Sequence, residues 1–265
     1  MAPWTLIRGL LCLAALLAAS SPAAAEEVPA VAAAADLQFA AREIAARFEA
    51  ETRREVKLAF GSSGNFTRQI EQGAPFRLFL SADETFVFRL ADAGKTENRG
   101  DLYAVGRIVL MVPRGSPLAV DPTLTDLAAA LRDGRLKKFA IANPEHAPYG
   151  RRAEEALRAA GLWERITPHL VLGENVAQAA QFASGGGTQG GIVAYSLALS
   201  PAVARLGAFA LIPEARHTPL RQRMVLLRGA GPTARAFYRY LQEPPARAIF
   251  SRYGFALPGG LPGGR

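Results

Sequence analysis

Between residues 31 and 84, an extended apolar run gives way three times to small residues that introduce a helix, and this repeated junction constrains the fold most strongly. The junctions span residues 31–37, 58–66 and 76–84. Each begins a helix directly after a strand, where the first backbone N–H groups lack partners and the helix dipole adds about half a positive charge. Several helix starts that converge on one point can bind an anion without Lys or Arg.

Strand-like and helix-like segments alternate from residue 26 onward, which favours an α/β fold with largely parallel sheets. Residues 102–112 form a long apolar segment with Gly106 inside it, and they predict a strand that crosses between two lobes. If the strand predicted at residues 223–227 returns to the first lobe, the chain crosses twice. A ligand would then bind in the cleft between the lobes.

The other elements follow from hydrophobic periodicity. One helix carries its apolar residues at helical spacing, at Leu37, Ala40, Ala41, Ile44 and Phe48. Further helices are expected at residues 65–72, 83–94, 124–132, 175–183, 233–242 and 244–253, with another after Pro148. Further strands are expected at residues 56–60, 78–80, 139–142 and 191–195.

The first 25 residues predict a secretory signal peptide that is cleaved before Glu26. Arg8 precedes an apolar run at residues 9–19, and small residues follow at 20–25. The run is shorter than the roughly 20 apolar residues that a membrane-spanning helix needs. Cys12, the single cysteine, lies in this leader. The mature chain therefore contains no thiol and must rely on its core, which suits the bacterial periplasm.

The same patterns divide the chain into a leader, two lobes and a tail. We expect residues 26–105 together with 222–257 to form lobe 1, and residues 106–221 to form lobe 2. Residues 258–265 are rich in Gly and Pro and predict a flexible tail.

The formal net charge of +8 favours encounter with anions but does not identify one. The basic residues are scattered, so solubility explains the charge equally well. Aromatic residues are only 8% of the chain and do not alternate with basic clusters, which argues against a nucleic-acid partner.

Three motifs suggest a dinucleotide site, a metal site or a catalytic serine, but the surrounding sequence does not support any of them. The glycines at residues 185–190 match the dinucleotide fingerprint, but a helix precedes them and a strand follows, the reverse of the required order. His146, His169 and His217 are isolated and lack metal-ligand spacing. Residues 61–64, Gly-Ser-Ser-Gly, are not a nucleophile elbow, and the sequence places no histidine beside them as a base.

The chain from about residue 28 to residue 256 resembles the periplasmic molybdate-binding proteins of ABC transporters. The similarity is carried by segments in the family's order and spacing, at residues 33–37, 60–64, 68–75, 78–83, 141–150, 173–176, 236–241 and 249–255. The resemblance implies a periplasmic-binding-protein fold of two α/β lobes joined by a two-strand hinge, with the ligand cleft between them. It implies no cofactor and no enzymatic activity.

The resemblance also implies that the ligand is molybdate or tungstate, held by neutral donors and delivered to the membrane permease of an ABC importer by a monomeric binding protein. Its ligand positions fall on Ser63 and Tyr149 by their hydroxyl groups, and on Ser63, Ala82 and Val176 by their N–H groups. The position after the first strand falls at Ala35 or Asp36. These residues would contact oxygen atoms of the anion, and none would ligate the molybdenum.

Asp36 departs from the family, which commonly has Ser, Thr or Asn at this junction. At 4 Å and an effective dielectric constant of about 20, each pair of like unit charges costs about 4 kcal/mol, and a dianion roughly twice that. Asp36 must therefore cap its own helix, hold a proton or indicate a different ligand. We favour the cap, in which the carboxylate accepts from the N–H of Gln38 or Phe39. Arg77 is a second departure, since relatives usually carry an acidic residue there.

The leading hypothesis is a periplasmic solute-binding protein for molybdate or tungstate. One alternative keeps the fold and lets Asp36 select a cationic or zwitterionic solute. Another, from a different class, is a secreted hydrolase that uses Ser62 or Ser63.

Overall fold

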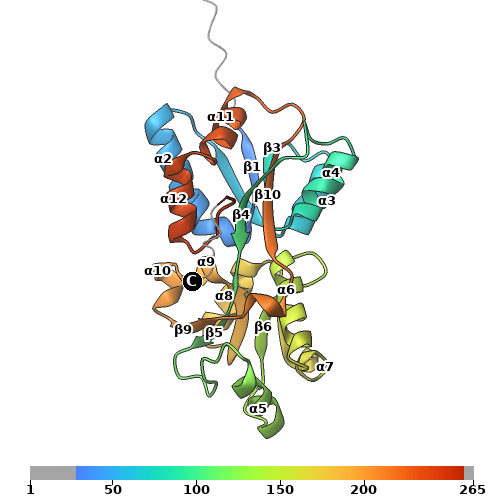
Figure 1. Ribbon diagram of the computed structural model, residues 1–265, viewed down its shortest axis with the longest axis vertical. Coiled ribbons are helices and arrows are strands. Elements are labelled where there is room, and N and C mark those ends of the chain that lie inside the picture. The colour runs from blue at the N-terminus through green and yellow to red at the C-terminus, as the bar shows by residue number, and fades with distance from the viewer. Residues whose placement is uncertain (1–27, 260–265) are drawn as a thin grey trace, which may run out of the picture.

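The computed structural model describes residues 28–259, which form two α/β lobes stacked along the long axis (Figure 1). Each lobe is built around a five-stranded sheet. The predicted signal peptide and the end of the predicted tail lie outside the described residues. The expected pair of α/β lobes is confirmed.

The sheet of the first lobe has the strand order β2-β1-β3-β10-β4. Its strands are β1 (Ala30–Ala34), β2 (Lys57–Gly61), β3 (Phe76–Ser81), β4 (Asp101–Gly106) and β10 (Leu220–Leu226). β1 pairs in parallel with β2 and β3, whereas β10 pairs antiparallel with β3 and β4.

The sheet of the second lobe has the order β7-β6-β8-β5-β9. Its strands are β5 (Ile108–Pro113), β6 (Phe139–Ala142), β7 (Leu170–Gly173), β8 (Gly190–Ala194) and β9 (Gly207–Leu211). β6 runs parallel to β7 and β8, whereas β5 runs antiparallel to β8 and β9. Both sheets are therefore mixed, and the expectation of largely parallel sheets holds only for the strands away from the crossings.

The crossing near residue 107 differs from the sequence expectation. The apolar segment at residues 102–112 is not one strand but two, since β4 ends at Gly106, β5 begins at Ile108, and the two belong to different sheets. Apolar patterning could not reveal this break because apolar residues continue from β4, which is half buried, into β5, which is fully buried. The chain returns to the first sheet between β9 and β10, and the two crossings run side by side in Figure 1.

Helices cover both faces of the first sheet (Figure 1). On one side lie α2 (Gln38–Thr52), α11 (Pro232–Tyr240) and α12 (Pro244–Arg252), and on the other lie α3 (Ser63–Glu71) and α4 (Glu84–Asp92). Each strand packs against both helix layers, because its successive side chains point to opposite faces of the sheet. Leu78 and Leu80 pack with Phe48 on the α2 side, whereas Phe79 packs with Phe66 on the α3 side.

The second lobe has its own core, centred on β5, β6 and β8. Its helices are α5 (Thr125–Asp133), α6 (Pro148–Ala159), α7 (Trp163–Ile166), α8 (Val176–Ser184), α9 (Tyr195–Ala198) and α10 (Pro201–Ala204). Residues 28–259 also contain three short 3₁₀ turns: η1 (Ala35–Leu37) follows β1, η2 (Thr167–His169) follows α7, and η3 (Glu214–Arg216) follows β9. Sequence periodicity did not predict β7, β9 and the four-residue helices, which are too short for a clear period.

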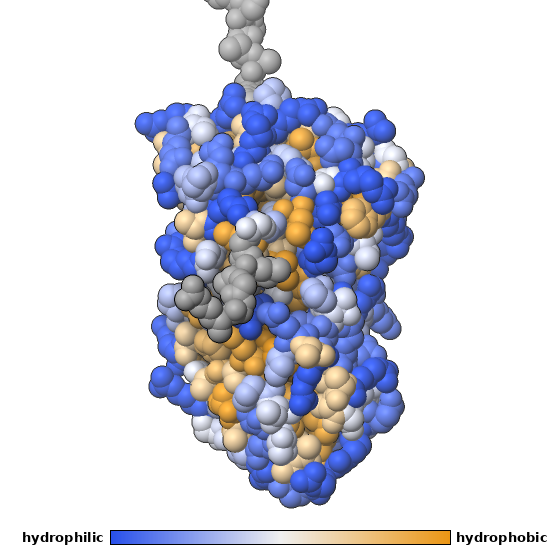
Figure 2. Space-filling view, viewed as in Figure 1, coloured by the Kyte–Doolittle hydropathy of each residue, from blue (hydrophilic) through white to orange (hydrophobic). Residues whose placement is uncertain are grey.

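Hydrophilic side chains dominate both ends of the molecule, and hydrophobic ones gather on one side of the second lobe (Figure 2). Among residues 28–259, no helix is both long enough and apolar enough to cross a membrane.

Candidate functional site

Three chain segments of the first lobe meet at one edge of its sheet. β1, β2 and β3 run parallel, so their carboxyl ends lie together. Ala35 and Asp36 follow β1, Ser62 and Ser63 follow β2, and Ala82 follows β3. This is the edge at which open α/β sheets bind ligands.

The second lobe faces this edge with two more helix starts. α6 begins at Pro148 after β6, and α8 begins at Val176 after β7. β6 and β7 are also parallel, so both helices start at the same edge of their sheet. Tyr149 in the first turn of α6 and Val176 at the first position of α8 are both buried.

The two edges enclose a cavity of about 10 Å³, roughly the space that one water molecule needs. It is smaller than the roughly 300–1,000 Å³ typical of pockets for drug-sized ligands. All six residues of the predicted site line it: Ala35, Asp36, Ser63, Ala82, Tyr149 and Val176. Ala34, Gly61, Ser62, Ala147 and Pro148, which were not predicted, line it as well. No Lys or Arg is among these described lining residues.

Capping side chains fix the helix starts. The hydroxyl of Ser62 accepts a hydrogen bond from the N–H of Asn65 at the start of α3, and Asp83 accepts from the N–H of Thr85 at the start of α4. The side chain of Asn175 accepts from Ala177 and Gln178 at the start of α8. The first N–H groups of a helix have no partner within that helix, and here the caps take some of them while the His146 carbonyl takes that of Gly64.

The donors of the first lobe also contact one another. The N–H of Ala82 donates to Oγ of Ser63 at 3.0 Å, and both residues are almost fully buried. This bond links the start of α3 to the start of α4. The Ser63 hydroxyl proton remains free for another acceptor, since the hydroxyl oxygen accepts this bond.

Asp36 does not cap its helix, so the interpretation favoured from sequence is wrong. The residues before η1 and α2 provide no side-chain cap. Oδ2 of Asp36 instead accepts from the hydroxyl of Tyr149 at 2.9 Å and from Nε2 of Gln222 at 2.6 Å. These partners lie 113 and 186 residues away along the chain, so no local pattern could indicate them.

Burial dominates the electrostatics of this carboxyl group. It raises the pKa of Asp36 to about 6, although hydrogen bonds from Gln222, from Tyr149 and from the backbone N–H groups of Asp36 and Leu37 lower it. Burial, with the nearby Asp36 charge, also raises the pKa of Tyr149 and that of Tyr103 well above the usual value. Both phenols are therefore neutral donors at physiological pH.

Arg77 lies too far away to neutralise Asp36. It stands near the beginning of β3, five residues before Ala82, and a strand advances about 3.3 Å per residue, which places it about 16 Å from the cavity edge.

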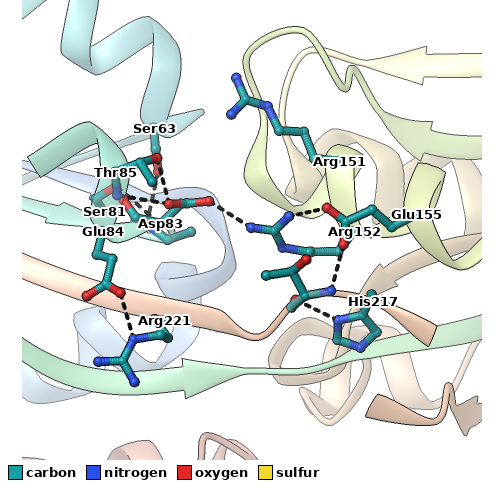
Figure 3. A network of polar contacts seen from close by, with 12 residues as sticks. Ser63, Ser81, Asp83, Glu84, Thr85, Arg151, Arg152, Glu155, His217 and Arg221 are labelled. Carbon is teal, nitrogen blue, oxygen red and sulfur yellow. Dashed lines mark hydrogen bonds and ion pairs between the residues drawn. The ribbon is translucent and has the colours of Figure 1, made fainter. Parts of the chain in front are cut away.

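A buried ion pair joins the lobes beside the cavity. Nη2 of Arg152 in α6 donates to Oδ2 of Asp83 at 2.9 Å, and the two side chains are 10% and 9% exposed. Figure 3 shows Arg152 between Asp83 on one lobe and Glu155 on the other, with Arg151 nearby. Arg151 lies over the ring of Phe86, 5.3 Å from its centroid, and adds a second contact from α6 to α4.

His146 provides a further contact between the lobes, which the sequence reasoning did not find. Its Nδ1 is 3.0 Å from Oγ of Ser62, and its backbone carbonyl accepts from the N–H of Gly64 at 2.9 Å. Its Nε2 is 3.6 Å from Glu174. A histidine therefore does lie beside Ser62, contrary to expectation. Ser62 is only 4% exposed, however, and its hydroxyl caps α3.

Gln222 contacts Asp36 but was not predicted, although its position in the sequence pattern of β10 indicates a buried polar residue. Along β10 the buried side chains alternate, at Leu220, Gln222 and Met224. A polar residue at a buried strand position requires a hydrogen-bond partner, which points to a polar contact inside the fold.

Among the described residues, no group of His, Cys, Asp and Glu side chains could hold a metal ion.

Comparison with known proteins agrees with this geometry. The family model of bacterial extracellular solute-binding proteins matches residues 29–256. The chain is 37% identical to the molybdate-binding protein ModA of Rhodobacter capsulatus over 96% of this chain and 97% of that one. It is 36% identical to ModA of Azotobacter vinelandii over 92% and 94% of the two chains.

Solved structures give the same result. The periplasmic molybdate-binding protein of Azotobacter vinelandii superposes with a TM-score of 0.77 at 28% identity, covering 87% of this chain and 99% of that one. The sulfate-binding protein SubI of Mycobacterium tuberculosis H37Rv shares the fold, with a TM-score of 0.72 at 17% identity over 89% and 88% of the two chains. From its sequence, its two-lobed fold and these relatives, the chain belongs to the bacterial extracellular solute-binding proteins, in the family that contains ModA.

Proposed function

We propose that this protein captures molybdate or tungstate in the periplasm and delivers it to the permease of an ABC importer. The observation that carries the proposal is the cavity between the lobes, at which helix starts from both lobes meet without Lys or Arg. Such a site suits a small oxyanion, because backbone N–H groups and helix dipoles stabilise negative charge without a counter-ion. Three ModA proteins, by name molybdate-binding, are 35 to 37% identical to this chain.

The donors are assigned to residues on both sides of the cavity. Ser63 would offer its hydroxyl and N–H groups from the first lobe, and Ala82 its N–H, which would leave Oγ of Ser63 for the ion. Val176 would offer its N–H from the second lobe, in the first turn of α8. Fixed donors around a small cavity select by the size of the tetrahedral ion, because a smaller ion cannot reach all of them at once.

Closure of the lobes is the signal that the importer reads in this proposal. The ion would bridge donors on both lobes and so favour the closed arrangement, in which Asp83 contacts Arg152. A ligand shifts such an equilibrium only through its differential affinity for the two states. An ion that contacts both lobes has that difference.

Isothermal titration of the mature protein with molybdate, tungstate, sulfate and phosphate tests the proposal. We expect tight binding of molybdate and tungstate and weaker binding of the two smaller anions. Absence of heat and of a thermal shift with both metal oxyanions would contradict it. The same preparation, treated with a serine-directed fluorophosphonate, should remain unlabelled, and labelling at Ser62 would support the hydrolase alternative instead.

The same proposal includes a periplasmic monomer released by cleavage before Glu26. If the ligand were instead a cationic or zwitterionic solute selected by Asp36, Asp36→Ser would abolish its binding. Stronger molybdate binding by that variant would favour the oxyanion.

A further inference from the structure

Asp36 carries the one carboxyl group among the described residues that line the cavity, and its two oxygen atoms have different surroundings. Oδ2 accepts two hydrogen bonds, from Tyr149 and Gln222. Oδ1 is buried and has no hydrogen-bond partner. A buried oxygen without a partner is costly, so this atom is suited to a bond that the present structure does not contain.

The hydrogen-bond directions around Asp36 follow from counting donors. The hydroxyl of Tyr103 donates to Oε1 of Gln222 at 2.8 Å, which turns the Gln222 amide nitrogen toward Asp36 and toward the Tyr149 hydroxyl at 3.1 Å. The single proton of Tyr149 goes to Oδ2 of Asp36. Tyr149 therefore has no proton left for an anion, and Oδ1 is the oxygen on which Asp36 can carry one.

Space for this network exists because residue 106 is glycine. A Cβ there would stand 2.3 Å from the Tyr149 hydroxyl and 2.7 Å from Nε2 of Gln222. The arrangement therefore joins the crossing strand β4 to the cavity wall. It is a closely packed network, since Tyr103, Tyr149 and Gln222 are all buried.

The influences on the pKa of Asp36 are burial and hydrogen bonds, and none of them is a cationic side chain. On α6, the buried Arg152 is paired with Asp83 and Glu155. The groups that act on it from α6 and β4 are the phenols of Tyr149 and Tyr103, and β10 contributes the neutral Gln222. From α9, Ser196 donates to the Asp36 carbonyl, and Tyr195 packs against Phe209. Helix α8 has no titratable side chain, Lys57 stands at the far end of β2, and α2 turns Arg42 to solvent.

We infer that Asp36 binds the oxyanion as the neutral acid, with its proton on Oδ1 donated to an anion oxygen, so that each molybdate is captured together with one proton. This inference rests on the proposed function. Written in full, the ionised protein, one proton from solvent and one molybdate dianion combine into a neutral-acid complex. No other group changes its charge.

Burial already favours the neutral form, since it raises the pKa of Asp36 to about 6. A dianion beside Oδ1 raises that pKa further, because like charges disfavour ionisation. The apparent affinity then scales with the protonated fraction of the free protein. For a free pKa of about 6 the dissociation constant should rise about 50-fold from pH 6 to pH 8, approaching tenfold per pH unit.

Titration calorimetry with micromolar molybdate at pH 6 and pH 8, in buffers of different ionisation enthalpy, measures both the affinity and the number of protons taken up. The wild type should take up close to one proton per molybdate at pH 8 and about half a proton at pH 6. Asp36→Asn keeps a neutral side chain of the same shape, so its affinity should not depend on pH and its proton uptake should vanish. Glu174→Gln removes an acid that is 61% exposed and does not line the cavity, and it should retain the wild-type pH dependence.

The outcomes separate this inference from the proposed function. Tight wild-type binding at both pH values without proton uptake would overturn the inference and leave the function intact. Tighter binding of hydrogen phosphate than of molybdate at pH 8, with no net proton uptake, would also overturn it, because the proton would then come from the ligand. If neither the wild type nor Asp36→Asn binds molybdate at pH 6, the proposed function itself fails.

Discussion

Replacing Arg152 by Met tests whether the buried ion pair between the lobes stabilises the closed form. Met retains much of the aliphatic stem of Arg152 but removes the charge that faces Asp83 at 2.9 Å. In the closed form Asp83 would then be a buried carboxylate without its partner, although Thr85 still donates to its Oδ1. In an open form water would solvate it.

The magnitude follows from this difference between the two forms. Removing one partner of a buried ion pair costs about 3–5 kcal/mol. Because Asp83 keeps its bonds to Thr85, we take the lower end, about 3 kcal/mol, which weakens ligand binding about 150-fold. The cores of the two lobes are largely distinct and share only a few residues at the cleft, so the unfolding temperature of the ligand-free variant should fall by no more than about 4 °C.

Titration calorimetry with molybdate measures this effect, with Arg158→Met as the matched control. Arg158 lies on the same helix and pairs with Glu154 at 2.8 Å, but its side chain is 52% exposed. An exposed pair contributes at most about 1 kcal/mol to stability, and this pair does not join the lobes, so the control should bind like the wild type. The double variant Asp83→Asn with Arg152→Met should recover at least about tenfold in affinity over Arg152→Met, since no lone charge is buried.

An affinity of Arg152→Met within about twofold of the wild type would refute this reasoning. It would mean that the ion pair either does not break on opening or contributes nothing to closure.

Two more predictions follow from the site. A Cβ at Gly64 would stand 2.6 Å from the His146 carbonyl oxygen, so Gly64→Ala should weaken molybdate binding by at least about tenfold. Gly187 lies in open space, so Gly187→Ala should bind molybdate like the wild type. Equal affinities of the two variants in titration calorimetry would contradict the clash. The pKa of Asp36 is raised from 3.8 to about 6, so its stability contribution is complete below pH 3.8 and is lost as pH rises through about 6. Asp36→Asn should therefore gain up to about 3 kcal/mol relative to the wild type between pH 4 and pH 8 in urea unfolding, and parallel pH profiles would count against it.

The sequence by itself determined most of the elements and the order of the site segments. Alternating apolar residues predicted β2 and β3, and helical periodicity predicted α2, because each pattern reflects a local geometry of period 2 or 3.6. The three strand-to-helix junctions of the first lobe were readable for the same reason. Together with the family resemblance, they brought all six predicted site residues to a single cavity.

Only the tertiary structure decided how these segments interact across the cleft. The bonds from Tyr149 and Gln222 to Asp36 and the ion pair between Asp83 and Arg152 join residues that are 69 to 186 residues apart. The division of residues 102–112 between two sheets is of the same kind, since both halves are apolar and only their partners differ. A local pattern records which side of a helix or strand is buried, but not which distant group it meets there. The raised pKa of Asp36 depends on its burial and on its bonds to Tyr149 and Gln222, so it is a property of the folded chain.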